Sequence, residues 1–448
     1  MSLDVNIGMV SLGCAKNLVD TEIALGYLVQ NGASLVDEPA EADVLIVNTC
    51  GFIGPAKEES IDTILEMAAY KRVGRCRGLI VTGCLSARYR EELMNEIPEI
   101  DGLLGTGEMD ELPSVVERVL TGMKVQTIRP EYFSYDDPEL PRVLSDGGHS
   151  AYLKIAEGCS HACAFCVIPK IRGPLRSRAM EAILREAQGL AAQGVRELNI
   201  IAQDTTAYGT DQGGRSIGQL LAGLDQTVDV DWIRMLYAYP TTLTADVLAV
   251  MAEARRLLPY FDIPLQHAAT SVLKAMHRPG DYQAQLGLIG QIRDAVPNAI
   301  LRSSFIVGFP GETEEDFAEL LRFLEEVQFH RVGIFVFSRE EDTIAYDMPG
   351  QVPENIKQDR YERAMALQRG ISLAHNQALL GQELDVLIEG LSTESDLVVV
   401  GRHSGQAPEV DGQVYLGSGS DKIGQIVRVR ITDAHAYDLV GEIVERTG

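Results

Sequence analysis

The sequence predicts an α/β protein built from three modules: an N-terminal open parallel α/β domain, a central partial (β/α)6 barrel and a small C-terminal all-β barrel. Three observations predict this organisation. Apolar strands alternate with helical patterns through the first two modules, a stretch rich in Pro, Asp and Gly separates them, and short strands with Gly and Asp turns fill the last part. We place the modules at residues 1–125, 151–380 and 381–448, with a linker at 126–150.

In the N-terminal module the strands are apolar runs rich in Val, Ile and Leu. We expect them at Ile7–Gly13, Asp43–Thr49 and Arg77–Gly83, with helices at Asn17–Gln30 and Pro55–Tyr70 between them. Strands that are apolar along nearly their whole length need cover on both faces. The pattern therefore predicts a parallel sheet with helices on each side.

The central module repeats a strand–helix unit, with helical patterns such as Met180–Gln193 and Glu314–Gln328 between the strands. A closed barrel of this kind uses eight units, so the shorter series predicts a partial barrel with its active site at the carboxyl ends of the strands. A long helix at 354–380 follows the last unit. The strands are expected at Ala151–Ala156, Val195–Ala202, Trp232–Tyr237, Leu258–Ile263, Leu301–Val307 and Val332–Phe337.

The C-terminal module changes character from residue 381 onward. Its apolar segments are short and are separated by Gly and Asp, a pattern that predicts strands of a small barrel. The segments are DVLIEG, LVVVGR, GQVYLG, QIVRVRIT and LVGEIVE.

The composition is that of a globular chain with a strong acidic bias. Hydrophobic residues make up 46%, charged residues 23%, and the formal net charge is −26. No apolar stretch is long enough to cross a membrane and the N-terminus lacks a signal-peptide pattern, so we expect a cytoplasmic protein without a membrane partner. The charge argues against nucleic acid as the main partner, because phosphates attract clustered Lys and Arg, and it suits a basic protein better.

Three cysteines on one loop are the strongest chemical signal. Cys159, Cys163 and Cys166 directly follow the first barrel strand. With seven cysteines and no secretion signal, a disulfide framework is not expected and the thiols are available for metal. Three thiolates at this spacing can bind three irons of a cubic cluster and leave the fourth iron open. Zinc is the alternative, but a structural zinc site uses four closed ligands, and only His161 is at hand as the fourth.

A second set of cysteines is spread through the N-terminal module. Cys14, Cys50 and Cys84 each stand at the carboxyl end of a predicted strand, in VSLGC, LIVNTC and LIVTGC. Strands of one parallel sheet end at the same edge, so these thiols are expected to converge on a second cluster with three protein ligands. The alternative is a coincidence of buried thiols. Cys76 precedes its strand and is interpreted as a bystander.

The loop from Cys159 to Cys166, with Phe165 at a position where an aromatic is favoured, resembles the signature of the radical S-adenosylmethionine (SAM) superfamily. Together with the N-terminal cysteines, the chain resembles the methylthiotransferase family of this superfamily over essentially its whole length, including a C-terminal module of the TRAM type. The resemblance implies two [4Fe–4S] clusters and SAM as cofactors. One SAM would methylate sulfur held at the N-terminal cluster, and a second would supply a radical that abstracts hydrogen from the substrate.

Within this family, the sequence of several segments resembles one branch in particular. That branch modifies the β-carbon of an aspartate on the twelfth protein of the small ribosomal subunit. The matching segments are SLGCAKNLVDTE, NTCGFI, CSHACAFCVIPKIRG, PLQHA and GFPGETEEDF. The resemblance implies that ribosomal protein as substrate, a reductant such as flavodoxin or ferredoxin, and a sulfur source. A sister branch methylthiolates an adenosine of transfer RNA and shares the clusters, so the cysteines do not separate the two.

The charge of the C-terminal module favours the protein substrate. An RNA-binding barrel normally presents basic and aromatic side chains. Here the basic residues from Gly381 onward are Arg402, Lys422, Arg428, Arg430 and Arg446. The acidic residues are Glu383, Asp385, Glu389, Glu394, Asp396, Glu409, Asp411, Asp421, Asp433, Asp438, Glu442 and Glu445.

Two further positions are expected to contact the cofactor: Phe165 on the cysteine loop and Gln203 at the end of the second barrel strand. Asp204 either shares that role or caps the next turn. His267 in PLQHA is either functional or part of the core. We assign no catalytic residue beyond the cluster ligands.

Two more segments each have a functional and a structural interpretation. The stretch from Gly308 to Glu312 allows either close approach of a ligand or a tight turn before a helix. Arg172, Arg176 and Arg178 are suited to bind a carboxylate of the cofactor or substrate, or they form a solvated basic stretch.

A non-enzymatic alternative is a two-cluster electron-transfer or sensing protein. Electron carriers usually close all four cluster positions with cysteine, and three ligands in each set disfavour this reading.

Overall fold

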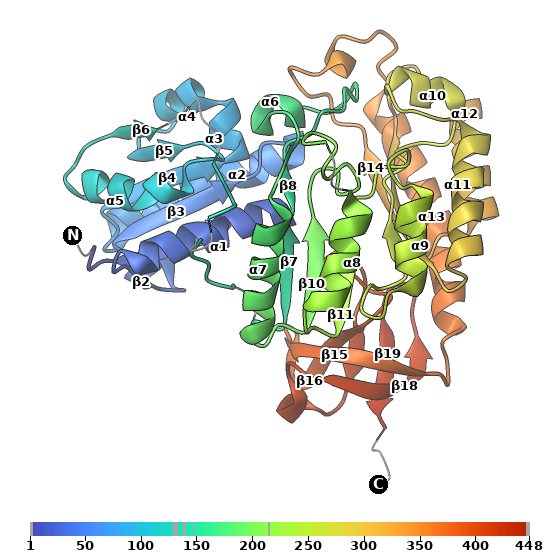
Figure 1. Ribbon diagram of the computed structural model, residues 1–448. Coiled ribbons are helices and arrows are strands. Elements are labelled where there is room, and N and C mark those ends of the chain that lie inside the picture. Colours follow the sequence, from blue (N-terminus) through green and yellow to red (C-terminus); the bar gives the residue numbers. More distant parts are fainter. Residues whose placement is uncertain are drawn as a thin grey trace. The chain divides into compact units, whose positions relative to one another are not determined.

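The computed structural model in Figure 1 describes residues 3–127, 129, 133–137, 140–145, 147–213 and 216–444. Parts of the predicted linker 126–150 and the last residues of the C-terminal module lie outside these ranges. The chain divides into two compact units. The first comprises residues 1–145, 156–185 and 338–343, and the second comprises 146–155, 186–337 and 344–448. The module boundaries at 125, 150 and 380 remain predictions.

The first unit contains a six-stranded parallel sheet in the order β2-β1-β3-β4-β5-β6. Every residue of β3 is buried, so the sheet is covered on both faces, as its continuous apolar pattern predicts. Sequence reasoning missed β2, β5 and β6, which are two or three residues long. The strands are β1 (Asn6–Ser11), β2 (Ser34–Leu35), β3 (Val44–Thr49), β4 (Gly78–Gly83), β5 (Gly102–Leu104) and β6 (Val125–Thr127).

The helices of this sheet domain follow the strands in alternation. A buried cluster joins Leu45 of β3 and Leu79 of β4 to Ile64 and Met67 of α2. Cys76 belongs to the same cluster, as expected for a bystander. The helices are α1 (Ala15–Gln30), α2 (Gly54–Val73), α3 (Cys84–Arg88), α4 (Arg90–Glu96) and α5 (Leu112–Leu120), with 3-10 turns η1 (Pro39–Glu41) and η2 (Met109–Glu111).

Two segments from beyond the linker complete the first unit. One is a two-stranded antiparallel ribbon of β8 (Ala156–Glu157) and β9 (Arg176–Ser177), with α6 (Ile168–Arg172) between its strands. The other is the segment Ser338–Thr343. Helix α7 (Met180–Ala192) contains the boundary to the second unit.

The second unit begins with the partial barrel. Its six strands run in chain order as two parallel sheets, β7-β10-β11 and β12-β13-β14. Between the sheets, Ile233 pairs with Leu257 and the Tyr237 backbone N–H donates to Asp262 Oδ2 at 3.0 Å. The strands are β7 (Ser150–Lys154), β10 (Glu197–Ile201), β11 (Trp232–Met235), β12 (Tyr260–Asp262), β13 (Ile300–Val307) and β14 (Arg331–Val336).

The first barrel strand differs from the expected Ala151–Ala156. β7 ends at Lys154, and Ala156 starts β8 in the first unit. The helices are α8 (Ile217–Thr227), α9 (Ala245–Glu253), α10 (Thr270–Ala275), α11 (Tyr282–Ala295), α12 (Glu314–Val327) and α13 (Glu354–Gln377), with the 3-10 turn η3 (Ile344–Tyr346).

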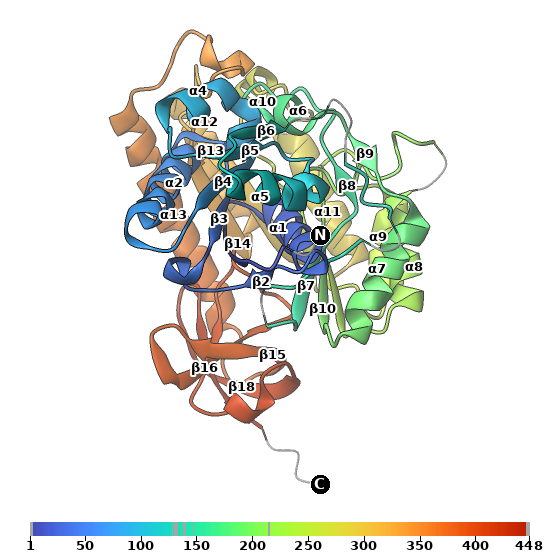
Figure 2. The ribbon, with the colours of Figure 1, turned by 90° about the vertical axis from the view of Figure 1, so that its left-hand side faces the viewer.

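The C-terminal module is a closed barrel in the order β15-β16-β17-β19-β18, as predicted (Figure 2). It contacts the barrel near the amino ends of the barrel strands, because Arg402 pairs with Glu197, the first residue of β10. The C-terminal module therefore lies away from the carboxyl ends of the barrel strands. Its elements are β15 (Glu383–Ser392), β16 (Ser395–His403), β17 (Val414–Leu416), η4 (Ser420–Lys422), β18 (Ile426–Ala434) and β19 (Leu439–Ile443).

Candidate functional site

Three cysteines converge at the carboxyl edge of the N-terminal sheet. Cys14 stands at the start of α1 after β1, Cys50 directly follows β3, and Cys84 opens α3 after β4. Strands β1, β3 and β4 are neighbours in the sheet, so their carboxyl ends lie side by side. Sequence reasoning expected this convergence, and the structure brings the three positions together.

Two glycines let these loops approach one another. Gly13 has a φ of +92°, and a Cβ at this position would lie 3.1 Å from the Cys50 Sγ. Gly83 has a φ of +101°, and a Cβ there would lie 2.3 Å from the Asn48 Oδ1. L-residues rarely adopt such φ angles, so glycine is required before each of these two cysteines.

Polar side chains from α1 and α2 fix the same loops. The Asn17 Nδ2 donates to the carbonyl oxygens of Leu12 at 3.0 Å and Thr49 at 2.9 Å, and so joins the Cys14 loop to the Cys50 loop. Ser60 accepts from the Cys50 backbone N–H and donates to its carbonyl, both at 3.0 Å. Sequence reasoning assigned no role to either residue, although Asn17 lies in the segment SLGCAKNLVDTE.

The three thiols influence one another's ionisation. Burial, together with the neighbouring Cys84 and Cys14 thiols, raises the pKa of Cys50 to about 11. Burial also raises the pKa of Cys84, against the lowering effect of Arg172. Adjacent thiolates repel one another until a cation neutralises them, so this set fits a positively charged metal cluster.

The pKa of the Cys14 thiol is lowered, in contrast to those of Cys50 and Cys84. Cys14 keeps an exposed surface. The protein around it raises the pKa of its thiol, but the charges of Lys16 and Arg172 and the backbone N–H groups of Asn17 and Lys16 outweigh this and lower the pKa. A thiolate is the form that binds metal, so Cys14 is the most readily available ligand of the set.

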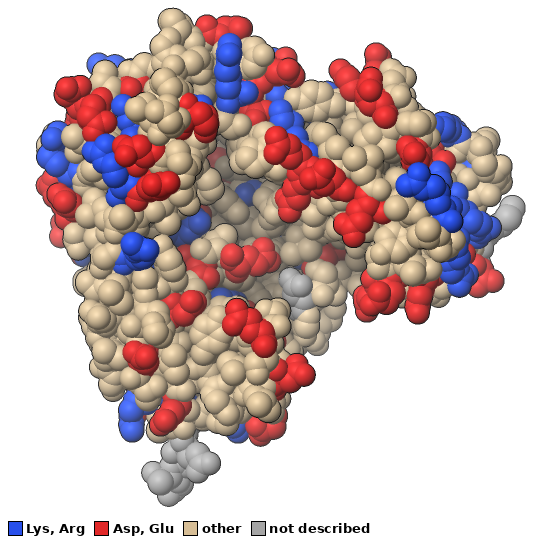
Figure 3. Space-filling model, turned by 180° about the vertical axis from the view of Figure 1, so that it is seen from behind, with Lys and Arg blue, Asp and Glu red and all other residues tan. Residues whose placement is uncertain are grey.

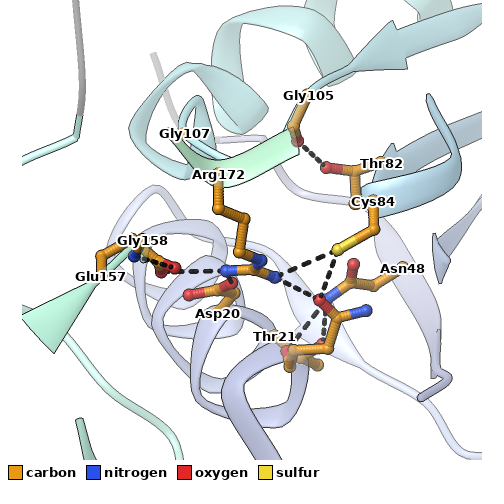
Figure 4. Close-up of polar contacts among 12 residues, drawn as sticks. Asp20, Thr21, Asn48, Thr82, Cys84, Gly105, Gly107, Glu157, Gly158 and Arg172 are labelled. Atoms are coloured by element: carbon orange, nitrogen blue, oxygen red, sulfur yellow. Dashed lines mark hydrogen bonds and ion pairs between the residues drawn. The ribbon is translucent and has the colours of Figure 1, made fainter. Parts of the chain in front are cut away.

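A buried arginine lies beside this site. Arg172 Nη2 donates to the Cys84 Sγ at 3.5 Å and to the Asn17 Oδ1 at 2.5 Å. Its Nη1 donates to Asp20 and Glu157, each at 2.9 Å (Figure 4). The sequence suggested that Arg172 binds a carboxylate of cofactor or substrate; the carboxylates it contacts in the structure belong to the protein.

The second set of cysteines lies on the loop between β8 and α6. The Cys159 backbone N–H donates to the Gly173 carbonyl at 3.0 Å, which closes the loop, and the Cys166 N–H donates to the Cys163 carbonyl at 3.1 Å. Cys159, Cys163, Phe165 and Cys166 are all half-buried. The three thiols are therefore presented on one ordered, partly accessible loop.

Among the described residues, no group of three His, Cys, Asp or Glu side chains is close enough to hold a single metal ion. A cubic cluster does not need such a group, because each thiolate binds a different iron. The zinc alternative for the loop from Cys159 to Cys166 gains no support from this arrangement.

The remaining candidates lie in the second unit. Gln203 follows β10 and is half-buried. Asp204 Oδ1 accepts from the Thr206 hydroxyl at 2.9 Å and from the Ala207 N–H at 3.1 Å, so it caps the turn, as one of its two readings proposed. His267 is fully buried, and its Nδ1 accepts from the Ala269 N–H at 3.0 Å, which places it in the core.

The stretch from Gly308 to Glu312 forms a turn with φ of +78° at Gly308. The Glu312 side chain accepts from the backbone N–H groups of Gly308 and Phe309, and Arg360 lies 3.3 Å from its Oε1. Arg176 and Arg178 donate to backbone carbonyls, at Arg172 and Tyr135 respectively. The contacts of Glu312 support the interpretation of Gly308–Glu312 as a turn. Arg172 and Arg178 are buried, so the alternative of a solvated basic stretch is wrong for these two residues.

Comparisons with protein families cover most of the chain. Residues 6–105 match Uncharacterized protein family UPF0004, residues 153–324 match the Radical SAM superfamily, and residues 380–444 match the TRAM domain. No helix of the described residues has the length and apolar character needed to cross a membrane.

Full-length relatives decide the family. The chain is 51% identical to the ribosomal protein uS12 methylthiotransferase RimO of Pelotomaculum thermopropionicum, over 99% of this chain and 100% of the relative. It is 47% identical to RimO of Syntrophotalea carbinolica, over 98% and 97%. The chain belongs to the RimO family. It is a transferase of the radical SAM type, and the RimO family implies SAM and [4Fe–4S] chemistry.

A solved structure has the same fold at low sequence identity. The radical SAM methyltransferase TsrM from Kitasatospora setae matches with a TM-score of 0.54 and 13% identity, covering 75% of each chain. This likeness concerns the fold alone. The RimO assignment rests on the full-length relatives.

Proposed function

We propose that this chain adds a methylthio group to the β-carbon of an aspartate in ribosomal protein uS12. The observation that carries the proposal is the pair of three-cysteine sets, one converging at the N-terminal sheet edge and one on the loop after β8. Each set can bind three irons of a cubic cluster and leave the fourth for another ligand. The substrate is inferred from the relatives, which are named ribosomal protein uS12 methylthiotransferase RimO.

The proposed cofactors are two [4Fe–4S] clusters and SAM. When bound, they supply reductive cleavage of SAM to a carbon radical, and a methylated sulfur for transfer. Cys159, Cys163 and Cys166 would hold the cluster that binds and reduces SAM. Phe165 and Gln203 are proposed to contact that cofactor.

Cys14, Cys50 and Cys84 would hold the second cluster in this proposal, which would supply the sulfur that is transferred. The close approach at Gly13 and Gly83 and the hydrogen bonds of Asn17 hold the three cysteine loops together. A flavodoxin or ferredoxin delivers electrons, and a separate source supplies sulfur.

The C-terminal module supports a protein substrate over transfer RNA. Every Lys or Arg that the structure describes in residues 381–444 lies within 4 Å of a carboxylate: Arg402, Lys422, Arg428 and Arg430. Acidic and basic side chains are interspersed over the face drawn in Figure 3. Paired cations are less available to phosphates, and the acidic balance suits a basic ribosomal protein.

The test is an anaerobic reaction with reconstituted clusters, reductant, sulfide and SAM. Protein uS12 and unmodified transfer RNA are offered separately, and mass spectrometry looks for the methylthio increment. A Cys159→Ala variant is the matched control and is expected to produce no 5′-deoxyadenosine. An increment on the uS12 aspartate supports the proposal. An increment on RNA alone assigns the chain to the sister reaction, and no 5′-deoxyadenosine from the parent with verified clusters argues against radical chemistry.

A further inference from the structure

Arg172 is a buried cation whose two terminal nitrogens serve different partners. Its side chain is 2% exposed. Nη1 faces the carboxylates of Asp20 and Glu157, and Nη2 faces the Cys84 sulfur and the Asn17 amide oxygen. A residue that only neutralised two buried acids would not need to direct its second nitrogen at a thiol.

The carboxylates orient this guanidinium. The Tyr135 hydroxyl lies 2.8 Å from Asp20 Oδ1 and 3.2 Å from Glu157 Oε2, so it bridges the two acids that hold Nη1. An arginine fork is planar and rigid, so fixing Nη1 also fixes the direction of Nη2. The cation is thereby held against Cys84 and cannot rotate away without breaking several buried contacts.

The arginine also connects the two cysteine sets. It is the last residue of α6, six positions after Cys166 on the same loop segment. Its Nη2 contacts belong to the N-terminal set: Cys84 itself and Asn17, which bonds the loops of Cys14 and Cys50. The segment that presents the second cysteine set therefore donates a charged hydrogen bond to the first.

We propose that Arg172 is a positioning residue that raises the reduction potential of the N-terminal cluster by donating a charge-assisted hydrogen bond to the Cys84 sulfur. The inference rests on the proposed role of Cys14, Cys50 and Cys84 as cluster ligands. Reduction adds negative charge to a cluster, and a hydrogen bond or fixed cation at a ligand sulfur stabilises the reduced form.

The test isolates the N-terminal cluster in the full chain. Cys159→Ala, Cys163→Ala and Cys166→Ala are combined as the parent, so that only the first set can be loaded with iron and sulfide. The midpoint potential is then measured anaerobically by redox titration with electron paramagnetic resonance. Arg172→Gln is expected to shift the potential downward at equal cluster content, and Arg172→Lys to restore part of the shift.

Two further variants protect the test against a simple folding defect. Asp20→Asn removes a negative charge and keeps Arg172, so the potential is expected to move upward. Cys76→Ala changes a core thiol that precedes β4, at the end of the strand opposite to Cys84, and its potential is expected to stay at the parent value. A folding defect alone would not raise the potential in one variant, lower it in another and leave it unchanged in the third.

The outcomes separate this inference from the proposed function. If the parent binds no cluster, the ligand assignment of the N-terminal cysteines fails, and the inference falls with it. If the parent binds a cluster and the potentials of Arg172→Gln and Asp20→Asn equal the parent value, the cluster assignment stands and the role of Arg172 is overturned.

Discussion

Cys84 and Cys76 are both buried thiols of the N-terminal sheet, yet only one stands at a carboxyl strand end. We expect Cys84→Ala in the full chain to bind about half the iron of the parent, because the second cysteine set stays intact. Cys76→Ala is the matched control, since Cys76 belongs to the apolar core and its Sγ contacts the Gly78 carbonyl. Iron analysis after reconstitution measures both. Equal losses in the two variants would contradict the ligand assignment.

His403 gives a pH dependence of stability in the second unit. Burial, followed by the charges of Arg331, Arg234 and Arg402, lowers its pKa from 6.5 to about 3. The unfolded chain binds this proton below pH 6.5 and the folded chain does so only near pH 3, so the stabilisation is complete above pH 6.5 and is lost as the pH falls toward 3. The free energy of unfolding is expected to drop by up to about 1.4 kcal/mol per pH unit from this group.

Urea unfolding between pH 7 and pH 4, followed by the fluorescence of the single tryptophan, Trp232, measures this slope. His403→Gln removes the group and is expected to flatten the curve. Half-buried His330, whose pKa is also lowered to about 3, remains and leaves a residual slope. An unchanged slope in His403→Gln would show that His403 does not carry the effect.

At the scale of single residues, the sequence predicted that Cys14, Cys50 and Cys84 meet at one sheet edge, but not the side chains that hold their loops. The cysteines follow strand ends, and that position is visible in the pattern of apolar residues. Asn17 and Arg172 lie 155 positions apart, and their contact exists only once the chain has folded. No local spacing encodes such a pair.

Among the elements, the segment Ser338–Thr343 has an anchoring role in the first unit. Glu340 is buried and binds Lys57 at 2.7 Å, Arg88 at 3.1 Å and the backbone N–H of Gly54 at the start of α2 at 2.6 Å. Arg88 in turn donates to the Gly51 carbonyl beside Cys50 at 3.0 Å. The segment therefore secures the start of α2, close to Cys50, and the end of α3, the short helix that begins at Cys84.

Glu340→Gln is expected to destabilise the first unit by about 2–4 kcal/mol, because Lys57 and Arg88 lose the carboxylate that they share. Hydrogen exchange at the first turn of α2 is expected to become faster. Glu341→Gln is the control, since Glu341 is exposed. If Glu341→Gln perturbs α2 as much as Glu340→Gln does, the segment has no anchoring role.

The predicted elements are accurate where apolar runs are long. The core strands β3, β4, β10 and β13 follow from their sequences. The very short strand β2 carries no periodicity, and it forms only because β1 offers a free edge for pairing. The break after Lys154 was also missed, since Ile155 and Ala156 continue the apolar run without a turn residue.

Across the whole molecule, contacts join the C-terminal module to the barrel within the second unit. Arg402 of β16 is 1% exposed and binds Glu197 of β10 at 2.5 Å, and Arg234 of β11 binds the same carboxylate at 2.8 Å. The two cations lower the pKa of Glu197 to about 2 against the effect of burial. The module is thus attached to the barrel by a buried ionic cluster.

Arg402→Met is expected to destabilise the second unit by about 3–5 kcal/mol, because Glu197 is left buried with one cation in place of two. Arg428→Met removes an exposed pair with Asp385 and is expected to cost about 1 kcal/mol or less. Urea unfolding followed by Trp232, which begins β11, compares the two. Similar losses in both variants would mean that the buried cluster contributes no more than a surface ion pair.

The three kinds of module could be predicted from the sequence pattern, but the grouping of segments into compact units could not. The cysteine loop from Cys159 to Cys166 groups with the N-terminal sheet domain, although it directly follows a barrel strand. Arg172 accounts for this grouping, because its partners Asp20, Asn17 and Cys84 all belong to that domain. Long-range ion pairs of this kind leave no trace in local sequence.

The central claim is that the chain moves a methylthio group onto the β-carbon of a uS12 aspartate. The most direct test uses uS12 carrying deuterium on aspartate β-carbons in a single-turnover reaction with the fully loaded enzyme. The account predicts that 5′-deoxyadenosine acquires deuterium and that the same aspartate gains the methylthio group. Deuterium-free 5′-deoxyadenosine together with unmodified uS12, from enzyme with both clusters verified, would contradict it.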